Sequence, residues 1–428
     1  MKRRVILMAA WLLLAGLASS RVATAQDTIK VGVLHSLSGT MAISETTLKD
    51  TILMMIDEQN KKGGLLGKKL QAVVVDPASD WPLFAEKAAQ LLEKDKVAVV
   101  FGCWTSVSRK SVLPVFEKDN GLLFYPVQYE GEESSKNVIY TGAAPNQQAI
   151  PAVDYLMKEV GVKRWVLEGT DYVYPRTTNK ILEAYLLAKG VKPEDITINY
   201  TPFGHSDWQT RVAAIKKFGS SGKKTAVVST INGDANVPFY KELGNQKISA
   251  EDIPVVAFSV GEEELSGLDT KPLVGHLAAW NYFESISTPA NKAFIDQWHT
   301  FIKKPKRTTN DPMEAHYIGF NLWVKAVQKA GTTDVEKVLA ALPGLETPNL
   351  TGGIARMLPN HHITKPVYIG EVKADGQFNV VWKSTGTVPG DAWSDYLPGS
   401  KDIDADWVTL KCGNYNKVTK KCSGQNYK

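Results

Sequence analysis

The stretch VAVVFGCWTS (residues 97–106), followed further along the chain by LFYPVQYE (residues 123–130), decides the fold. Each segment opens with a short apolar run typical of a strand buried on both faces, and Ser106 is a candidate cap for a helix through 112–115. Parallel strands deliver their following loops to one sheet edge, where open α/β sheets bind ligands. An indole, two hydroxyls, an amide and phenols gather there. They predict a site for a small neutral polar molecule, with ordinary loop capping and packing as the alternative.

The N-terminus has the three parts of a secretory signal peptide. Basic residues lie at 2–4, an apolar stretch at 5–17, and the small-residue cleavage pattern Ala-Thr-Ala at 23–25. We therefore expect residues 1–25 to be removed on export, with Gln26 as the first mature residue. The apolar stretch is too short to span a bilayer, and no later segment reaches the required length. The mature protein is expected to be soluble.

The charge of the chain changes when the predicted signal peptide is set aside. Four of the 50 Lys and Arg residues and none of the 45 Asp and Glu residues lie within 1–25, so 46 basic residues face 45 acidic ones in the remainder. The sequence has no basic stripe with interleaved aromatic residues, so no nucleic-acid partner is expected. Residues 26–428 form a chain too long for a single hydrophobic core of ordinary size, so two domains are predicted.

Short apolar runs alternate with helical segments along most of the chain. The runs that predict strands lie at 29–34, 70–75, 97–101, 122–125, 165–167, 225–230, 254–259 and 277–280. Helices of about 12 residues between them predict βαβ units and a parallel sheet. Near the C-terminus, runs at 367–372 and 378–382 flank a turn and predict a β-hairpin. The absence of a linker favours two α/β lobes joined by several strand crossings.

Two patterns near the C-terminus concern disulfides and metals. Cys412 and Cys422 bracket a polar loop, and exported proteins keep disulfides, so a local disulfide is predicted. A metal clip at these cysteines lacks further ligands at zinc spacing. Asp402, Asp404 and Asp406 alternate along the chain and leave calcium binding open, although the glycine and distal Glu of an EF-hand are missing.

The best case for an enzyme rests on Cys103 followed by Trp104, because nitrilase-type amidases carry a Cys, an aromatic and then an acidic residue. In this chain Thr105 stands at the position of the acidic residue. Nothing nearby in sequence supplies a general base or lowers the pKa of the thiol. A small buried Cys after a strand is therefore favoured, and a secreted Cys103 amidase is the alternative. His361 and His362 follow a turn-like sequence and predict an exposed loop pair. No catalytic residue, metal or cofactor is assigned.

Several groups of residues in combination resemble one protein family. They lie at 102–106 with 109–110, 124–126 with 129–131, 144–147, and 171–176. Together they are similar to the amide and urea branch of the type I periplasmic binding proteins, which are relatives of the branched-chain amino acid binding proteins. The similarity is greatest to the urea-binding components of urea ABC transporters. It covers the chain from residue 28 to about 382.

The resemblance implies a fold of two α/β lobes linked by three crossings, each lobe a mostly parallel sheet flanked by helices, with the ligand cleft between the lobes. The corresponding division places 26–145 and 277–360 in the first lobe, and 146–276 and 361–428 in the second. Another member of this branch is an intracellular regulator of an amidase operon. The predicted signal peptide argues against that role and for transport.

Candidate ligand-binding residues carry over by position from the amide regulator, where the matching residues are a Tyr and a Ser, a Thr and a Pro, and two second-lobe tyrosines. The positions in this chain are Trp104 and Ser106, Val127 and Gln128, and Tyr172 and Tyr174. Thr105 joins them from the same loop. The replacement of Tyr by Trp and of Thr by Val implies that the pocket is not a copy of the acetamide site.

The chemistry of urea adds Asp234 to these candidates. Urea is flat and neutral, with four N–H bonds and one carbonyl, so a specific site needs several acceptors, one or two donors and aromatic faces. Asp234 lies at a strand end of the predicted second lobe, and its carboxylate can accept two N–H groups of urea. Acetamide would bind less well, because its methyl group would leave one of these acceptors unpaired. A helix N-cap before Ala235 is the alternative. An amino-acid ligand needs charged partners for its α-amino and α-carboxylate groups. In the loops 102–106 and 125–130, the only charged residue is Glu130, at the end of the second loop.

The sequence and the resemblance together predict a periplasmic, monomeric solute-binding protein. We expect its lobes to close on urea or a closely related short-chain amide, which it delivers to ABC permease subunits at the inner membrane. A receptor for branched-chain amino acids or another amide is the alternative.

Overall fold

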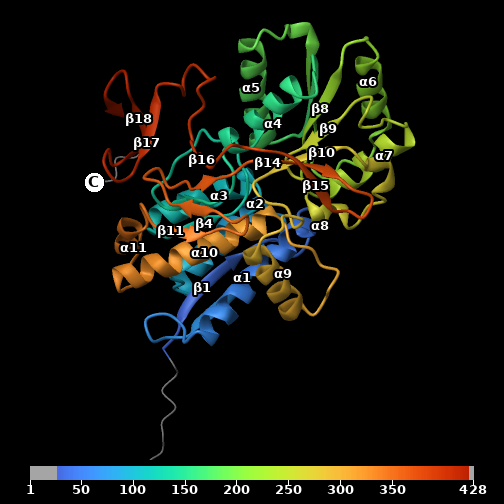
Figure 1. Cartoon of the computed structure of the whole chain (residues 1–428). Coiled ribbons are helices and arrows are strands. Elements are labelled where there is room, and N and C mark those ends of the chain that lie inside the picture. Colours follow the sequence, from blue (N-terminus) through green and yellow to red (C-terminus); the bar gives the residue numbers. More distant parts are fainter. Residues whose placement is uncertain (1–26, 424–428) are drawn as a thin grey trace, which may run out of the picture.

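The computed structural model describes residues 27–423, so the predicted signal peptide lies outside the described residues. Two α/β lobes make up most of the molecule, one containing β1, α1 and α10 and the other containing α4 to α7 (Figure 1). A small β unit with β17 and β18 lies beside them. Each lobe is built on its own sheet, as the α/β alternation in the sequence predicts.

The first sheet has the strand order β2-β1-β3-β4-β5, and all neighbouring strands are parallel. Its strands are β1 (Ile29–Leu34), β2 (Leu70–Val75), β3 (Val99–Gly102), β4 (Leu123–Tyr125) and β5 (Val138–Tyr140). The helices packed on it are α1 (Ala42–Lys61), α2 (Trp81–Ala89), α3 (Ser106–Lys118), α9 (Pro289–Ile302), α10 (Asp311–Ala330) and α11 (Val335–Ala341). Because helices cover both faces, β3 is fully buried, which explains its unbroken apolar run.

The second sheet has the strand order β15-β14-β10-β9-β8-β6-β7. Its strands are β6 (Arg164–Thr170), β7 (Ile196–Thr201), β8 (Thr225–Thr230), β9 (Val255–Ala257), β10 (Leu277–Trp280), β14 (Tyr368–Val372) and β15 (Phe378–Lys383). Its main helices are α4 (Ala149–Lys158), α5 (Val173–Ala188), α6 (Gln209–Gly219) and α7 (Asn236–Asn245). The β14–β15 pair is antiparallel, which confirms the predicted hairpin.

The crossings between the lobes differ from the expected boundaries in two places, at residue 277 and after residue 360, where Ile363 packs in the core of the first lobe. We expected the first lobe to resume at residue 277, but β10 pairs with β9 and β14 in the second sheet. The chain therefore returns to the first lobe after Trp280, and α9 and α10 pack there. An apolar run such as β10 fits the interior of either sheet, so its sequence does not say which sheet it joins.

The C-terminal segment also departs from its expected place in the second lobe. Strands β17 (Ile403–Asp406), β18 (Cys412–Asn416) and β19 (Lys421–Cys422) form a separate antiparallel sheet, and Cys412 is disulfide-bonded to Cys422. The unit rests on the first lobe, because the Trp407 indole N–H donates to Ser134 Oγ at 3.0 Å. The sequence contains no apolar periodicity that could have placed this unit.

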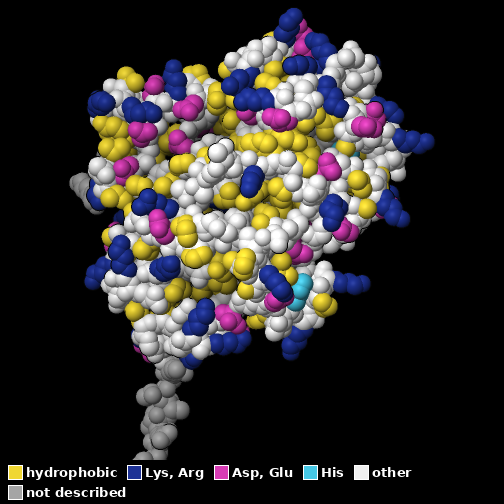
Figure 2. Space-filling view, in the orientation of Figure 1, with side chains coloured by type: hydrophobic (Ala, Val, Ile, Leu, Met, Phe, Trp, Pro, Cys, Tyr) yellow, Lys and Arg dark blue, Asp and Glu magenta, His cyan; other side chains and the backbone are white. Residues whose placement is uncertain are grey.

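Basic and acidic side chains are interspersed on the face drawn in Figure 2, over both lobes. Charge is therefore spread over this face, in line with the near balance of basic and acidic residues outside 1–25. Within residues 27–423, no helix is both long enough and apolar enough to cross a bilayer.

Candidate functional site

The two lobes meet at the carboxyl ends of their strands, and direct hydrogen bonds join them there. The Trp104 indole N–H, after β3, donates to Asn232 Oδ1, after β8, at 3.3 Å. The Gln128 amide, after β4, donates to Ser259 Oγ, after β9, at 2.7 Å. All four side chains are buried. The opposed sheet edges therefore enclose a polar site, at the place where α/β sheets bind ligands.

The structure brings part of the predicted set together at this site. Trp104, Ser106, Gln128 and Tyr174 are buried at the lobe junction, and Tyr172 is half-buried beside Tyr174, with ring centroids 6.1 Å apart. The Tyr125 hydroxyl donates to the backbone carbonyl of Trp104 and so holds this loop in place.

Two predicted residues have structural roles at this edge. The Thr105 hydroxyl accepts the backbone N–H of Ser108 at 3.1 Å and caps α3, so the helix cap lies one residue before the predicted Ser106. Extended backbone at Thr105 is the usual conformation of a cap residue. Val127 packs into the core of the first lobe and offers no polar group.

The Tyr174 hydroxyl and the Gln128 amide oxygen are buried, and within the described chain neither makes a hydrogen bond of ordinary geometry. Burial raises the pKa of Tyr174 well above its usual value, and weak hydrogen bonding to the adjacent Gln128 and Ser259 side chains only partly offsets this rise. The phenol therefore stays protonated and can donate. A buried donor and a buried acceptor without partners are costly unless a ligand satisfies them.

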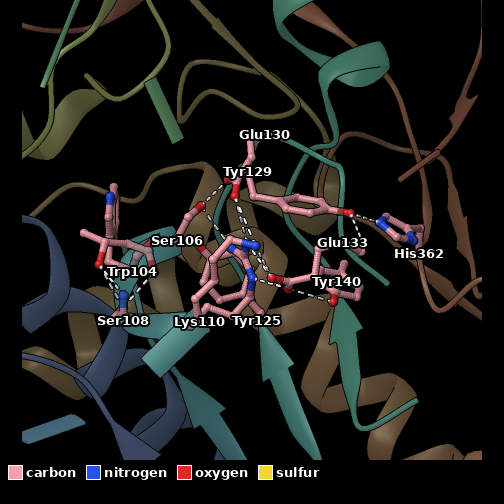
Figure 3. A network of polar contacts seen from close by, with 12 residues as sticks. Trp104, Ser106, Ser108, Lys110, Tyr125, Tyr129, Glu130, Glu133, Tyr140 and His362 are labelled. Carbon is pink, nitrogen blue, oxygen red and sulfur yellow. Dashed lines mark hydrogen bonds and ion pairs between the residues drawn. The ribbon is translucent and has the colours of Figure 1, made fainter. Parts of the chain in front are cut away.

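A buried ion-pair network lies directly beneath this site (Figure 3). The Arg109 guanidinium binds Glu133 Oε1 through Nε at 2.7 Å and Glu130 Oε1 through Nη2 at 3.4 Å. The rings of Tyr125 and Tyr129 each lie 4.7 Å from the guanidinium carbon, within cation–π range. Burial alone would raise the pKa of Glu133, but Arg109 and the adjacent lysine lower it to about 2. Glu133 is therefore ionised at neutral pH.

Glu130 connects this network to the second lobe. Ser106 Oγ donates to Glu130 Oε2, and Arg109 Nη1 donates to the same Ser106 hydroxyl at 3.1 Å. Burial has the largest effect on the pKa values of Tyr172 and Tyr174 and raises both. The charge of Glu130, across the lobe junction, raises them further. The field of this buried carboxylate thus reaches the second-lobe tyrosines.

Sequence reasoning did not include Glu130 or Arg109 among the site residues. The available signal was the spacing of Ser106 and Arg109, which is one helical turn, together with Glu130 in the loop after a buried strand. Neither observation says that the three side chains meet, because the loop and the helix are distant in sequence.

Asp234 does not join the site, contrary to the prediction. Its side chain is exposed, and its backbone N–H donates to the carbonyl of Thr40 at 3.1 Å. Gly233 adopts a left-handed backbone (φ 70°) that starts a short 3₁₀ turn, Gly233–Ala235. This turn directs the carboxylate to solvent, so the contact between the lobes at this point is made by backbone.

Cys103 is unsuited to act as a nucleophile. The thiol is fully buried, and burial, with the nearby charge of Glu45, raises its pKa far above neutrality. The reactive thiolate is therefore suppressed. The predicted exposed pair is also wrong, since His361 and His362 are buried and His362 Nε2 lies 2.6 Å from the Tyr129 hydroxyl.

Metal binding has no geometric support in residues 27–423, where no group of three or more His, Cys, Asp or Glu side chains is placed to hold an ion. In the calcium candidate, Asp404 pairs with Lys417 at 3.4 Å, and Asp406 accepts the backbone N–H groups of Val408 and Thr409. Two of the three carboxylates, those of Asp404 and Asp406, are therefore already engaged by groups of the protein itself.

The chain matches the family described as "Periplasmic binding protein domain" over residues 29–399. The Leu/Ile/Val-binding protein BraC3 of Rhizobium johnstonii is 27% identical over 355 residues, which are 80% of this chain and 90% of that protein. A solute binding protein of an ABC transporter from Rhodopseudomonas palustris HaA2, solved with p-hydroxybenzoic acid, has a TM-score of 0.73 at 21% identity and covers 85% of this chain and 98% of that chain.

One further match is short. Limonene hydroxylase of Geobacillus stearothermophilus is 30% identical over 124 residues, which are 28% of this chain and 22% of that protein. The chain thus spans about a fifth of that protein's length, and nothing about its activity transfers.

The family match covers most of the chain and agrees with two opposed α/β lobes that enclose a polar site. Proteins of this family bind solutes and are not enzymes, and membership implies a periplasmic location. The chain belongs to the periplasmic binding protein family.

Proposed function

We propose that the site between the lobes binds urea or a closely related short-chain amide and that the protein delivers it to the membrane permease. The observation that carries the proposal is the buried Tyr174 hydroxyl and Gln128 amide oxygen, neither of which makes a hydrogen bond of ordinary geometry, within reach of the charge of Glu130. Urea has a carbonyl that can accept from the phenol and four N–H groups that can donate to the amide and the carboxylate.

The direct contacts between the lobes support a small ligand. Single hydrogen bonds join the lobes at Trp104–Asn232 and at Gln128–Ser259, so a bulky ligand between them would break these bonds. A short amide would leave at least one in place. The Trp104 indole also provides a flat face suited to a planar molecule.

An amino-acid or aromatic-acid ligand is the second candidate, and the names of the relatives favour it. Glu130 would have to accept a ligand ammonium group in addition to Ser106 and Arg109, which its two oxygens already bind. A ligand carboxylate would need a cation, and the nearby Arg109 is already bound to Glu130 and Glu133. The local charge balance therefore favours a neutral ligand.

Titration calorimetry of the purified protein with urea, acetamide, formamide, leucine and p-hydroxybenzoate tests the proposal. We expect urea or one of the two amides to bind more tightly than leucine and p-hydroxybenzoate. Tight leucine binding with no heat from any amide would contradict the proposal and establish the amino-acid alternative.

Trp104 should report lobe closure by fluorescence, because its indole bonds the second lobe directly. With 11 Trp residues in the chain, the test is substitution. Trp104→Phe should remove most of the ligand-induced change in emission. Trp382→Phe, in the β15 strand away from the lobe junction, should leave the change intact. An undiminished signal in Trp104→Phe would exclude Trp104 from the site.

A further inference from the structure

The loop that carries Glu130 has an unusual backbone. Gly131 and Glu132 both adopt left-handed conformations, with φ of 69° and 58°. Glycine tolerates this region, but a residue with a Cβ is strained there. Such strain persists only where the surroundings hold the backbone, and it concentrates at functional sites.

The groups that hold Glu132 come from one distant segment of the chain. Its backbone N–H donates to the carbonyl of Ala392 at 2.6 Å. Its carboxylate accepts the backbone N–H of Ser394 at 3.1 Å through Oε1 and the hydroxyl of Ser400 through Oε2. At Gly131, an added Cβ would lie 2.6 Å from the Ala392 carbonyl, so the loop and the segment are in close contact.

The same segment contacts the loop at a further point and is also held together internally. The Trp407 indole N–H donates to Ser134 Oγ at 3.0 Å, and the Trp393 indole N–H donates to the carbonyl of Gly413 at 2.8 Å. Gly413 follows Cys412, whose disulfide closes the small β unit. We name residues 391–413 the C-terminal brace. The family match ends at residue 399, so part of the brace lies beyond it.

We propose that the C-terminal brace positions Glu130 for the ligand by holding Glu132 in its strained conformation. Glu130 and Glu133 lie on the Arg109 side of the loop, and Glu132 lies on the brace side. If Glu132 is released, its backbone relaxes, and the Glu130 carboxylate two residues away leaves its place beside Ser106 and Arg109. Glu132 is thus a positioning residue. This inference rests on the proposed function only in that the lobe junction binds a ligand.

Glu132→Asn separates positioning from general folding. Asn tolerates left-handed backbone, but its side chain is shorter and neutral and cannot keep both contacts of the carboxylate. We expect urea affinity to fall at least about tenfold and amide hydrogen exchange over residues 128–134 to accelerate. Lys420→Asn is the matched control, because Lys420 has a φ of 57° and is exposed in the β18–β19 turn. It should change neither measurement.

Ser400→Ala gives a milder test, since it removes one hydrogen bond from the same carboxylate. We expect a smaller loss of affinity, and no further loss when it is combined with Glu132→Asn, because both act through one contact. Additive losses, or unchanged exchange over 128–134 in Glu132→Asn, would overturn the proposal.

Failure of the wild-type protein to bind urea would instead contradict the proposed function. In that case the positioning role of the C-terminal brace is tested by hydrogen exchange in Glu132→Asn, which needs no ligand. It is also tested by the affinity of this variant for whichever compound of the calorimetric panel binds.

Discussion

Replacement of Arg109 by Met is expected to lower the free energy of unfolding by about 3–5 kcal/mol, the largest stability effect that we predict. The guanidinium is fully buried and pairs with Glu130 and Glu133, between the rings of Tyr125 and Tyr129. Met fills much of the volume but leaves two buried carboxylates without their cation. Chemical unfolding with guanidinium chloride measures the loss, because urea is a proposed ligand.

Lys118→Met in the same helix is the matched control. Its side chain is exposed and pairs only with surface carboxylates, so the unfolding midpoint should not change. A comparable loss in both variants would show that α3 tolerates no substitution and would remove the buried ion pair as the cause.

The deficit of Arg109→Met should also depend on pH. Glu133 has its pKa lowered to about 2 in the folded protein, against about 4.3 when unfolded. A lowered carboxylate pKa contributes stability above the unfolded value, and this contribution is lost as the pH falls through the folded value. The difference between wild type and variant should therefore be full at pH 7 and shrink from about pH 4 towards pH 2. A deficit independent of pH would contradict this account.

Glu130→Gln is expected to weaken urea binding at least about tenfold. The substitution keeps the shape of the side chain but replaces one acceptor oxygen with a donor that faces an N–H group of urea. Two buried donors left unpaired cost about 1–3 kcal/mol, and about 1.4 kcal/mol corresponds to a tenfold loss. Acetamide can turn its carbonyl towards the new donor, so its affinity should fall less or rise.

Asp234→Asn is the control for this selectivity test. The Asp234 side chain is exposed, so both affinities should stay within about twofold of wild type. Equal and small effects of Glu130→Gln on the two ligands would leave Glu130 as part of the buried network alone. The selectivity would then have to come from Gln128 and Tyr174.

The sequence by itself determined the features that depend on local pattern. The strand Ile29–Leu34 was predicted to the residue, because a strand buried on both faces is mainly apolar, and only Lys30 near its start interrupts the pattern. The hairpin of β14 and β15 followed from its turn, and the disulfide between Cys412 and Cys422 is present as their spacing and the predicted export suggested. The edge that carries Trp104 and Gln128 followed from two buried parallel strands, since their loops must share one side of the sheet.

Only the tertiary structure decided the features that join distant segments. Asp234 had the right chemistry and the right strand end, but the turn at Gly233 directs it to solvent. Glu130 became the buried carboxylate of the site because Arg109, 21 positions earlier, reaches it from a helix. Strand β10 and the C-terminal brace also took places that their sequences do not specify. Hydrophobic period fixes which face of an element is buried, whereas the partner of a buried charge is fixed by how the elements pack.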